Sequence, residues 1–444
     1  MAADRIDSNT TGPVSTALFT DMYELTMLEA ALADGTGHRP CAFEVFARRL
    51  PAGRRYGVVA GTARLLDALA SFRFGDAELD VVSRFLSPST VEWLRAYRFS
   101  GDIDGYAEGD FYFPGSPILS VRGSFAECVL LETLALSILN HDSAIASAAA
   151  RMVSAADGRT MIEMGSRRTH EESAVAAARA AYLAGFDSTS NLEAARRYGI
   201  PAAGTAAHAF TLLHTTTAGR NEESAFRSQI ESLGVDTTLL VDTYDITAAV
   251  RTAVEVAGPQ LGGVRIDSGD LGVLARQVRE QLDSLGATGT KIVMSGDLDE
   301  YAIAGLRAEP CDVYGVGTSV VTGSGAPTAG MVYKLVEVDG IPVEKRSAHK
   351  QSRGGAKRAV RFARPTGTLT EEVIYSAHLP APTGEGTARE LMVPLVRGGE
   401  LVEGLPTLEE SRAFLAAGLV SLPWEGLMLS EGDPAVPTRF VGQG

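Results

Sequence analysis

The feature that most constrains this chain is a unit repeated between residues 160 and 320, in which a short apolar run ends in a polar or glycine-rich cluster and a helical stretch follows. The runs with their clusters are TMIEMGSRRTH (160–170), PAAGTAAHAF (201–210), LLVDTYD (239–245), GVRIDSGDL (263–271), KIVMSGDLDE (291–300) and VYGVGTSV (313–320). Alternating strands and helices form a parallel sheet. The clusters would then share the rim where the carboxyl ends of the strands meet, which is where active sites lie in parallel barrels. The repeat therefore predicts an enzyme that handles a phosphorylated small molecule.

The number of repeats predicts the fold class. Candidate strands begin near residues 160, 186, 202, 237, 263, 290 and 312. About seven units are more than a simple open sheet usually holds, so we predict an α/β fold with an irregular α/β barrel of about seven parallel strands. Outside this region, short apolar runs mix with helical stretches. We expect an N-terminal α+β domain over 1–125, a catalytic barrel over 126–335 and a C-terminal segment over 336–444 that returns to the first domain, so that the second domain is built from both chain ends.

Composition excludes several classes of function. The 444 residues are 45% hydrophobic and 21% charged, as in globular proteins with a sizeable core. A net charge of −15 argues against a nucleic-acid partner, because phosphates demand a basic surface. The three cysteines, Cys41, Cys128 and Cys311, are too far apart for a zinc or redox motif. The polar first dozen residues lack a signal core, and no stretch approaches the ~20 apolar residues that span a membrane. We expect a cytoplasmic protein with no membrane partner and a frayed N-terminus.

His208 is the sharpest single candidate for catalysis. It opens a predicted helix just after Gly204 and Thr205, at the end of a predicted strand. A lone histidine at such an edge is more often structural, but the preceding Gly-Thr pair favours a functional role. Asp242, at the end of the neighbouring unit, could accept one imidazole N–H and leave the other nitrogen as nucleophile or base. Whether the two side chains touch is left open by the sequence.

Four further charged residues lie at strand ends. Arg265 and Asp267 are two apart in a strand, so they share one face. An arginine grips a carboxylate or phosphate with two N–H groups, and an aspartate binds sugar hydroxyls or magnesium-bound water. A structural ion pair between them is the simpler alternative. Arg167 and Arg168 suit an anionic substrate, unless one of them pairs with a neighbouring glutamate.

Two glycine-containing clusters indicate a phosphate site. Gly296 and Asp297 follow one apolar run, and Gly317 and Thr318 follow the next. Glycine allows backbone N–H groups to approach a phosphate, and a helix N-terminus adds partial positive charge. Neither cluster matches the Walker or dinucleotide motif, so each alone is weak. On adjacent strands, the two together favour one phosphate site.

Taken together, the motifs resemble those of the nicotinate phosphoribosyltransferase family. The matching segments are TDMYELTM (20–27), FEVFARRLP (43–51), EMGSRRTH (163–170), GFDSTSN (185–191), GTAAHAF (204–210), LVDTYD (240–245), RIDSGDL (265–271), SGDLDE (295–300) and GVGTSV (315–320). The resemblance runs from about residue 18 to 360. It implies condensation of nicotinate with 5-phosphoribosyl 1-pyrophosphate to nicotinate mononucleotide and pyrophosphate, coupled to ATP hydrolysis in a ligase-type reaction. This is the entry step of NAD salvage from nicotinic acid.

The resemblance also implies roles for individual residues. The family's GT-x-x-H histidine, which ATP phosphorylates, corresponds to His208, and Asp242 would orient it. Tyr23 would stack on the pyridine ring in the site of a partner subunit, which implies a homodimer with shared active sites. Thr205 and Arg265 correspond to the nicotinate-contacting positions. The phosphoribosyl and phosphate contacts would come from Arg167, Asp267, Gly296, Asp297, Gly317 and Thr318. Because no metal cage is visible, Mg²⁺ is expected to arrive with the phosphates, and ATP is a co-substrate.

Three alternatives stay open. A nicotinamide-using relative would share the fold and the histidine, although the double arginine of EMGSRRTH favours the acid. Quinolinate phosphoribosyltransferase would need more basic residues for two carboxylates and has no phosphohistidine. A catalytically silent relative that senses nucleotide would have no physical reason to keep His208, Asp242, Arg265 and Thr318 together. The basic segment 345–361, with seven Lys or Arg and no acid, is read either as a phosphate-contacting loop or as a solvated strand face.

Overall fold

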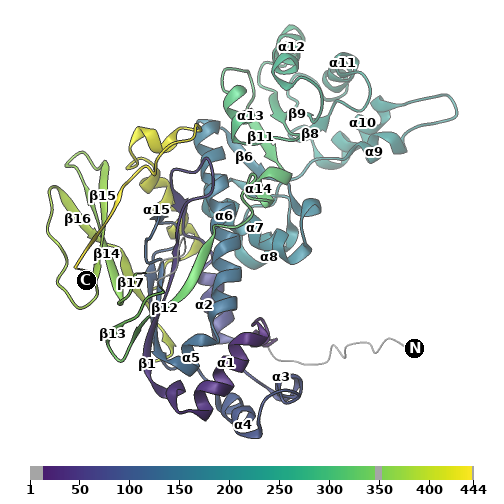
Figure 1. Cartoon of the computed structure of the whole chain (residues 1–444). Coiled ribbons are helices and arrows are strands. Elements are labelled where there is room, and N and C mark those ends of the chain that lie inside the picture. Colours follow the sequence, from purple (N-terminus) through teal and green to yellow (C-terminus); the bar gives the residue numbers. More distant parts are fainter. Residues whose placement is uncertain (1–13, 346–352, 443–444) are drawn as a thin grey trace. The chain divides into compact units, whose positions relative to one another are not determined.

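The computed structural model describes residues 14–345 and 353–442 and divides the chain into two compact units (Figure 1). Unit 1 is formed by the described residues of Met1–Ser143, Thr328–Gly426 and Glu431–Gly444, and unit 2 by Ala144–Pro327 and Leu427–Ser430. The sequence prediction had drawn the corresponding boundaries at 125/126 and 335/336. The predicted fraying of the first dozen residues lies outside the described residues.

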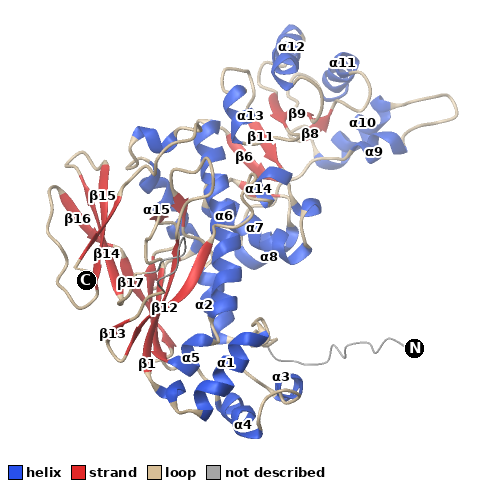
Figure 2. Ribbon diagram, in the orientation of Figure 1, coloured by secondary structure: helices blue, strands red, loops and turns tan. Residues whose placement is uncertain are grey.

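Unit 2 is built on a parallel sheet whose strands are short and mostly buried (Figure 2). The strands are β6 (Thr160–Glu163), β7 (Ser188–Thr189), β8 (Thr238–Leu240), β9 (Gly263–Ile266), β10 (Lys291–Met294) and β11 (Val313–Val316). Their order is β7-β6-β11-β10-β9-β8, and every neighbouring pair is parallel. Burial on both faces is typical of parallel sheets covered by helices. The mixed α/β class is therefore confirmed.

The predicted irregular barrel of about seven strands is confirmed only in part, because the described parallel sheet has six strands. The predicted strand near residue 202 is reduced to one bridge, between Thr189 and Ala202. Among the described strands, β8 pairs with β9 alone, so the sheet is an open half-barrel. The physical reason lies in the sequence PAAGTAA at 201–207. Pro201 lacks an N–H, Gly204 weakens a strand, and the alanines offer little apolar surface to pack against neighbouring strands.

Helices follow the strands of unit 2, as the repeat predicted. They are α7 (Glu171–Leu183), α8 (Leu192–Tyr198), α9 (His208–Leu213), α10 (Glu222–Leu233), α11 (Ile246–Ala257), α12 (Leu271–Ser284), α13 (Glu300–Gly305) and α14 (Thr318–Val321). Asn221 and Asp270 cap α10 and α12, because their side chains accept hydrogen bonds from the backbone N–H groups of Ser224 and Val273. Asp245 caps α11 in the same way. Caps of this kind hold the polar clusters at fixed points on the rim.

Unit 1 contains an antiparallel sheet of order β13-β12-β1-β5-β3-β17-β18, a second sheet of order β16-β14-β15-β19 and the pair β2-β4. The first sheet has β1 (Pro40–Ala47), β3 (Asp102–Tyr106), β5 (Leu119–Ser124), β12 (Met331–Val338), β13 (Ile341–Pro342), β17 (Met392–Arg397) and β18 (Glu400–Leu401). The others have β2 (Gly57–Val58), β4 (Phe111–Tyr112), β14 (Lys357–Ala363), β15 (Leu369–Ser376), β16 (Thr387–Glu390) and β19 (Thr438–Val441). Both chain ends thus contribute strands to one unit.

The helices of unit 1 come mainly from the first third of the chain. They are α1 (Met22–Ala33), α2 (Thr62–Ala70), α3 (Asp76–Val82), α4 (Pro88–Ala96), α5 (Phe125–Val129) and α15 (Leu408–Leu419). The long helix α6 (Glu132–Ala156) begins in unit 1 and ends in unit 2. Three single turns, Thr36–His38, Ser166–Arg168 and Trp424–Leu427, complete the helical elements of the described residues.

One helical segment corrects an expectation from the sequence. Phe125–Ala156 is long and apolar enough to cross a membrane by length and composition alone. However, 67% of its most apolar window is buried inside the protein. A helix that is apolar on most faces is usually a core helix when it is buried in this way, so its apolar length does not point to a membrane.

The described part of the basic segment 345–361 is neither of the two forms expected. Residues 346–352 lie outside the described residues, and Lys357 and Arg361 lie on the buried strand β14. The Lys357 ammonium lies 2.9 Å from Glu44, and Arg361 binds Asp110 at 2.6 Å and Glu372 at 2.7 Å. These cations therefore stabilise unit 1. A buried arginine with two carboxylate partners is costly to remove, because it leaves uncompensated buried charge.

We expect Arg361→Met to lower the free energy of unfolding by about 3–5 kcal/mol, since Glu372 would stay buried without a cation and Asp110 would keep only Arg389. The matched control is Arg439→Met on β19 of the same sheet, whose partner Glu371 is partly exposed. There the expected loss is about 0–1 kcal/mol. Denaturant unfolding followed by circular dichroism measures both. Equal losses would show that burial of the pair is not what matters.

Candidate functional site

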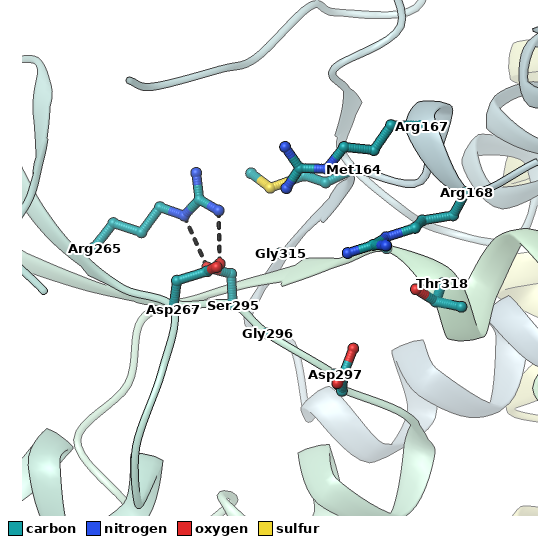
Figure 3. A pocket seen from close by; sticks show the side chains of 11 residues that line it. Met164, Arg167, Arg168, Arg265, Asp267, Ser295, Gly296, Asp297, Gly315 and Thr318 are labelled. Carbon is teal, nitrogen blue, oxygen red and sulfur yellow. Dashed lines mark hydrogen bonds and ion pairs between the residues drawn. The ribbon is translucent and has the colours of Figure 1, made fainter. Parts of the chain in front are cut away.

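A pocket of about 220 Å³ lies at the carboxyl ends of β6, β9, β10 and β11 in unit 2 (Figure 3). Its wall is formed by Met164, Arg167, Arg168, Arg265, Asp267, Ser295, Gly296, Asp297, Gly315, Gly317 and Thr318. The residues predicted to bind the phosphoribosyl and phosphate groups all lie on this wall, together with Arg265. Parallel strands bring their C-terminal residues to one rim, so four segments far apart in sequence meet here.

Glycines allow the loops of this rim to lie close together. A Cβ atom on Gly315 would lie 2.8 Å from the sulfur of Met164, and one on Gly165 would lie 2.2 Å from a methyl group of Val321. Gly296 has a φ of 123°, in the region that disfavours side chains, and a Cβ there would lie 3.0 Å from the carbonyl oxygen of Asp267. Any larger residue at these positions would push the walls of the pocket apart.

The cationic side of the pocket comes from one turn, Ser166–Arg168, which follows β6. Arg167 and Arg168 are exposed, and Figure 3 shows both side chains extending towards the pocket, with Asp297 and Thr318 beyond them. Within the described residues neither arginine has an ion pair. Glu163 instead accepts hydrogen bonds from Gly165 and Thr189. Two unpaired guanidinium groups beside glycine-rich loops are suited to an anion such as a phosphate.

Arg265 is held by hydrogen bonds from three directions. Its Nη2 donates to Asp267 at 2.7 Å, its Nε to Ser295 at 2.8 Å and its Nη1 to Thr205 at 3.1 Å. Burial acts to raise the pKa of Asp267, but hydrogen bonds from Ser295 and Arg265 outweigh it and lower that pKa overall. The carboxylate is therefore ionised at neutral pH.

A second pocket of about 240 Å³ shares part of its wall with the first. It is lined by Met164, Ser166, Arg167, Ser190, Gly204, Thr205, Ala206, Ala207 and Arg265. Met164, Arg167 and Arg265 line both pockets. The predicted nicotinate residues Thr205 and Arg265 therefore lie together, beside the predicted phosphate residues. The arrangement offers adjacent spaces for two anionic groups.

His208 and Asp242 lie near each other, a point that the sequence had left open. The imidazole Nε2 is 3.8 Å from Asp242 Oδ1, and Nδ1 is 3.2 Å from the hydroxyl of Thr243. Asp242 is buried, and its Oδ2 accepts hydrogen bonds from the backbone of Asp267 and the hydroxyl of Ser268. Its Oδ1 has no hydrogen-bond partner. His208 is the first residue of α9, and 43% of its side chain is exposed, so a ligand can reach it.

Tyr23 belongs to unit 1, whereas the other predicted site residues belong to unit 2. It is the second residue of α1, and 46% of it is exposed. Burial of the phenol and the nearby charge of Glu132 raise the pKa of Tyr23 to about 12. The ring therefore stays neutral at physiological pH and offers a flat surface for stacking.

Sequence reasoning did not select two groups that the structure brings to the site. Ser295 lies one residue before Gly296, and its link to Arg265 depends on the pairing of β10 with β9. Glu222 opens α10, and its buried Oε1 has no hydrogen-bond partner. Burial, followed by the charges of Asp245 and Asp242, raises the pKa of Glu222 to about 7. Ser295 begins the matching segment SGDLDE but received no role of its own, and Glu222 matched no motif.

The raised pKa of Glu222 predicts that Glu222→Gln stabilises the fold to an extent that depends on pH. The folded state holds the proton more tightly than the unfolded chain, whose pKa is near 4.5. This stabilisation is complete below pH 4.5 and is lost as the pH rises through about 7. Glutamine cannot ionise. At pH 8 the free energy of unfolding of the variant should therefore exceed that of the natural protein by on the order of 1 kcal/mol, allowing for solvent screening, and at pH 4.5 the two should differ little.

Thermal unfolding at both pH values measures the gain. The matched control is Glu223→Gln, one residue along the helix, where the side chain is exposed and pairs with Arg227. The control should shift the melting temperature equally at both pH values. If the stability gained by Glu222→Gln does not increase with pH, the pKa of Glu222 is not raised in the folded protein.

Within residues 14–345 and 353–442, no group of three or more His, Cys, Asp or Glu is arranged to hold a metal ion. The carboxylates of Asp267 and Asp297 nevertheless lie on the wall of the first pocket. Two separated carboxylates beside an anion site fit Mg²⁺ that keeps water and phosphate oxygens as most of its ligands.

Comparisons with known proteins agree on one family. A model of the nicotinate phosphoribosyltransferase N-terminal domain matches residues 18–140, and a model of the nicotinate phosphoribosyltransferase family matches residues 160–366. The chain is 66% identical over 427 residues to nicotinate phosphoribosyltransferase pncB1 of Mycobacterium tuberculosis, covering 96% of this chain and 95% of that protein. It is 37% identical over 447 residues to pncB2 of the same species, with coverages of 96% and 93%. The crystal structure of human nicotinic acid phosphoribosyltransferase matches with a TM-score of 0.79 at 27% identity, covering 95% of this chain and 97% of that chain.

Proposed function

The chain belongs to the nicotinate phosphoribosyltransferase family, and we propose that it condenses nicotinate with 5-phosphoribosyl 1-pyrophosphate to form nicotinate mononucleotide and pyrophosphate. The observation that carries this proposal is the pair of pockets that share Arg265 and Arg167. The reaction joins two anionic molecules, so the site needs adjacent anion-binding spaces with cations between them. The product would enter NAD salvage.

The side chains of the two pockets have separate tasks in this proposal. Arg265 and Thr205 hold the nicotinate carboxylate. The 5′-phosphate and ribose of the second substrate are held by Arg167, Asp267, Gly296, Asp297, Gly317 and Thr318. The pyridine nitrogen then attacks the anomeric carbon, the bond to pyrophosphate breaks, and positive charge develops on the ribose. The protein acts chiefly by placing the two reactants in line and excluding other orientations.

The leaving group requires neutralisation of its charge. Mg²⁺ bound to the pyrophosphate supplies this as a Lewis acid. Asp267 and Asp297 would hold the ion through its water ligands, since both carboxylates face the first pocket. Arg168 lies on the same wall and adds a cation that the protein itself provides.

ATP enters as a co-substrate through His208. We propose that the imidazole takes the γ-phosphoryl group, with the N–P bond forming as the bond to ADP breaks, and that water later removes it as phosphate. Asp242, 3.8 Å from the ring, would orient the imidazole and balance its positive charge. Phosphorylation would reshape the neighbouring pocket and so link ATP hydrolysis to the synthesis of the nucleotide.

The partner is proposed to be a second copy of the chain. The N-terminal part of unit 1 exposes apolar side chains that a homodimer would cover, namely Leu18, Phe19, Met22, Tyr23 and Met27. In the dimer, Tyr23 would stack on the pyridine ring in the site of the other subunit. We also propose that the protein works in the cytoplasm, because its three cysteines have no zinc-binding or redox spacing. The net charge of −15 favours the absence of a nucleic-acid partner, and we propose no membrane partner.

The first test is pyrophosphate release from 5-phosphoribosyl 1-pyrophosphate with nicotinate or nicotinamide, each with and without ATP. We expect turnover with nicotinate, because Arg265 and Thr205 match a carboxylate. ATP should raise this turnover strongly, because phosphorylation of His208 would reshape the neighbouring pocket. Turnover with nicotinamide alone would reverse the assignment of Arg265. No turnover with either base would favour a nucleotide-sensing protein on the same fold.

Replacing His208 by Ala should abolish ATPase activity and ATP stimulation while slow basal synthesis persists, since the pockets are unchanged. His214→Ala is the matched control on the same stretch of chain, because its imidazole bonds only to the carbonyl of Phe210. Radiolabel from [γ-³²P]ATP should appear on the control and not on the His208 variant. Full ATP stimulation without His208 would rule out a phosphohistidine at this position.

Mixing two variants that lack ATP-stimulated activity tests the shared site. If Tyr23 acts in the partner's site, an equal mixture of Tyr23→Ala and His208→Ala subunits should regain about a quarter of the ATP-stimulated activity after subunit exchange. Half of the dimers are then mixed, and each mixed dimer has one intact site. If Tyr23 acts within its own subunit, no mixed dimer has an intact site and activity stays at the level of the separate variants.

A further inference from the structure

Arg265, Asp267 and Ser295 form a closed triangle of hydrogen bonds (Figure 3). Arg265 donates to both partners, and the Ser295 hydroxyl donates to Asp267 Oδ1 at 2.5 Å. The carbonyl oxygen of Ile266, the other acceptor near this hydroxyl, is 3.5 Å away. Ser295 is 2% exposed, so bulk water does not compete for these bonds. The triangle involves two proposed substrate-binding residues and a third residue that has no role in the proposed chemistry.

The triangle decides which edge of the guanidinium is available. Nε and Nη2 lie on one edge of the planar group, and Ser295 and Asp267 occupy that edge. A guanidinium has five N–H bonds. Three are used by protein partners, including the one from Nη1 to Thr205. The two that remain lie one on each terminal nitrogen. They face the same way, as a bidentate carboxylate requires, when Thr205 takes the Nη1 hydrogen on the side of Cδ.

Ser295 also prevents a stronger competing interaction. An aspartate beside an arginine commonly takes two N–H groups in parallel, and such a pairing would satisfy Asp267 at the expense of a ligand. Here the serine oxygen occupies Nε, and Asp267 reaches only Nη2. The hydroxyl of Ser295 can do this because it donates a hydrogen bond to the carboxylate and accepts one from the guanidinium at the same time. The result is an ion pair that leaves Arg265 free to bind a second carboxylate.

We propose that Ser295 is a positioning residue that fixes the guanidinium of Arg265 towards the second pocket and thereby sets the preference for a carboxylate over an amide. The proposal rests on the proposed function, because it takes the ligand of that pocket to be nicotinate. An amide has one neutral acceptor oxygen, and its NH2 group would face the second N–H, so the aligned edge favours the acid.

The packing around Ser295 limits the variants that test it. Ser295 is 2% exposed, so a larger side chain would have little room there. Threonine is therefore unsuitable. Ser295→Ala removes the hydroxyl, and Ser295→Cys retains the volume with a much weaker donor and acceptor.

Steady-state kinetics of both variants provide the test. We expect the KM for nicotinate to rise about tenfold in each, and the preference for nicotinate over nicotinamide to fall by a similar factor, while the KM for 5-phosphoribosyl 1-pyrophosphate changes little. The matched control is Ser116→Ala in unit 1, another buried serine that donates to a carboxylate, that of Glu372. The control should lose stability without any change in base preference.

A double-mutant cycle with Arg265→Lys tests whether Ser295 acts through Arg265. Lysine has no Nε–Nη edge, so the change caused by Ser295→Ala should largely disappear in that background. Titration calorimetry with nicotinate replaces kinetics for any variant whose turnover is too slow. Equal effects of Ser295→Ala in both backgrounds would overturn the proposal.

Other outcomes separate this inference from the proposed function. If Ser295→Cys matches the natural protein while Ser295→Ala does not, packing rather than hydrogen bonding is responsible, and the proposal fails. If the variants lose kcat without any change in base preference, the role of Ser295 is only structural. A natural protein that uses nicotinate, with Ser295 variants that keep its KM, overturns this inference alone. A natural protein that does not bind nicotinate overturns both.

Discussion

The register between β9 and β10 is the constraint on which the site depends. Arg265 pairs with Val293 and Ile266 with Met294, and the ladder continues through a hydrogen bond from the Ser295 N–H to Ile266. This register places Ser295 beside Asp267 at the end of both strands. A shift by one residue would turn every side chain of a strand to its opposite face, so the triangle around Arg265 would be lost. Burial of both strands makes such a shift costly.

The arginines with a structural role are paired with carboxylates, whereas the arginines beside the first pocket are not. Arg361 in unit 1 is buried between two carboxylates, and Arg151 in unit 2 lies beside Glu300. In the described part of the chain, Arg167 and Arg168 instead keep their charge without an ion pair, although the protein carries a net charge of −15. An acidic protein has carboxylates to spare, so cations left unpaired at a glycine-rich rim are poised for an anion from solution.

The sequence predicted the site better than it predicted the sheet. Residues at strand ends were identifiable because apolar runs stop there, and the first pocket gathers them from four segments. The strand predicted near residue 202 does not form, because Pro201 and its small neighbours do not support the hydrogen bonds and packing of a strand. Only a single bridge, between Thr189 and Ala202, forms there. Lys357 and Arg361 were read as solvated or phosphate-contacting because their partners, Glu44 and Asp110, are 313 and 251 residues away in sequence. Position in the chain carries no signal for such pairs.

The resemblance to the family gave a role to a residue that the chemistry of the sequence alone did not select. An exposed tyrosine on α1 has no local feature that marks it as a binding residue, and the family assignment alone gives Tyr23 a task. Ser295 shows the converse limit. A serine before Gly-Asp suggested only a phosphate loop, and its link to Arg265 emerged once β9 and β10 were paired.

The surroundings of His208 bear on the proposed phosphoryl transfer. Asp242 lies beside the ring, and Glu222 and Asp245 add carboxylates near Asp242. Three ionised carboxylates would stabilise a protonated imidazole but would repel the phosphoryl group that the ring is proposed to accept. The pKa of Glu222, raised to about 7 by burial and by these same charges, leaves that residue partly neutral at physiological pH. The site thereby keeps the orienting carboxylate of Asp242 while limiting the negative charge that an incoming phosphate meets. The helix N-terminus at His208 and the Arg220 guanidinium stacked on Tyr244 act in the same direction, since both place positive charge next to this rim.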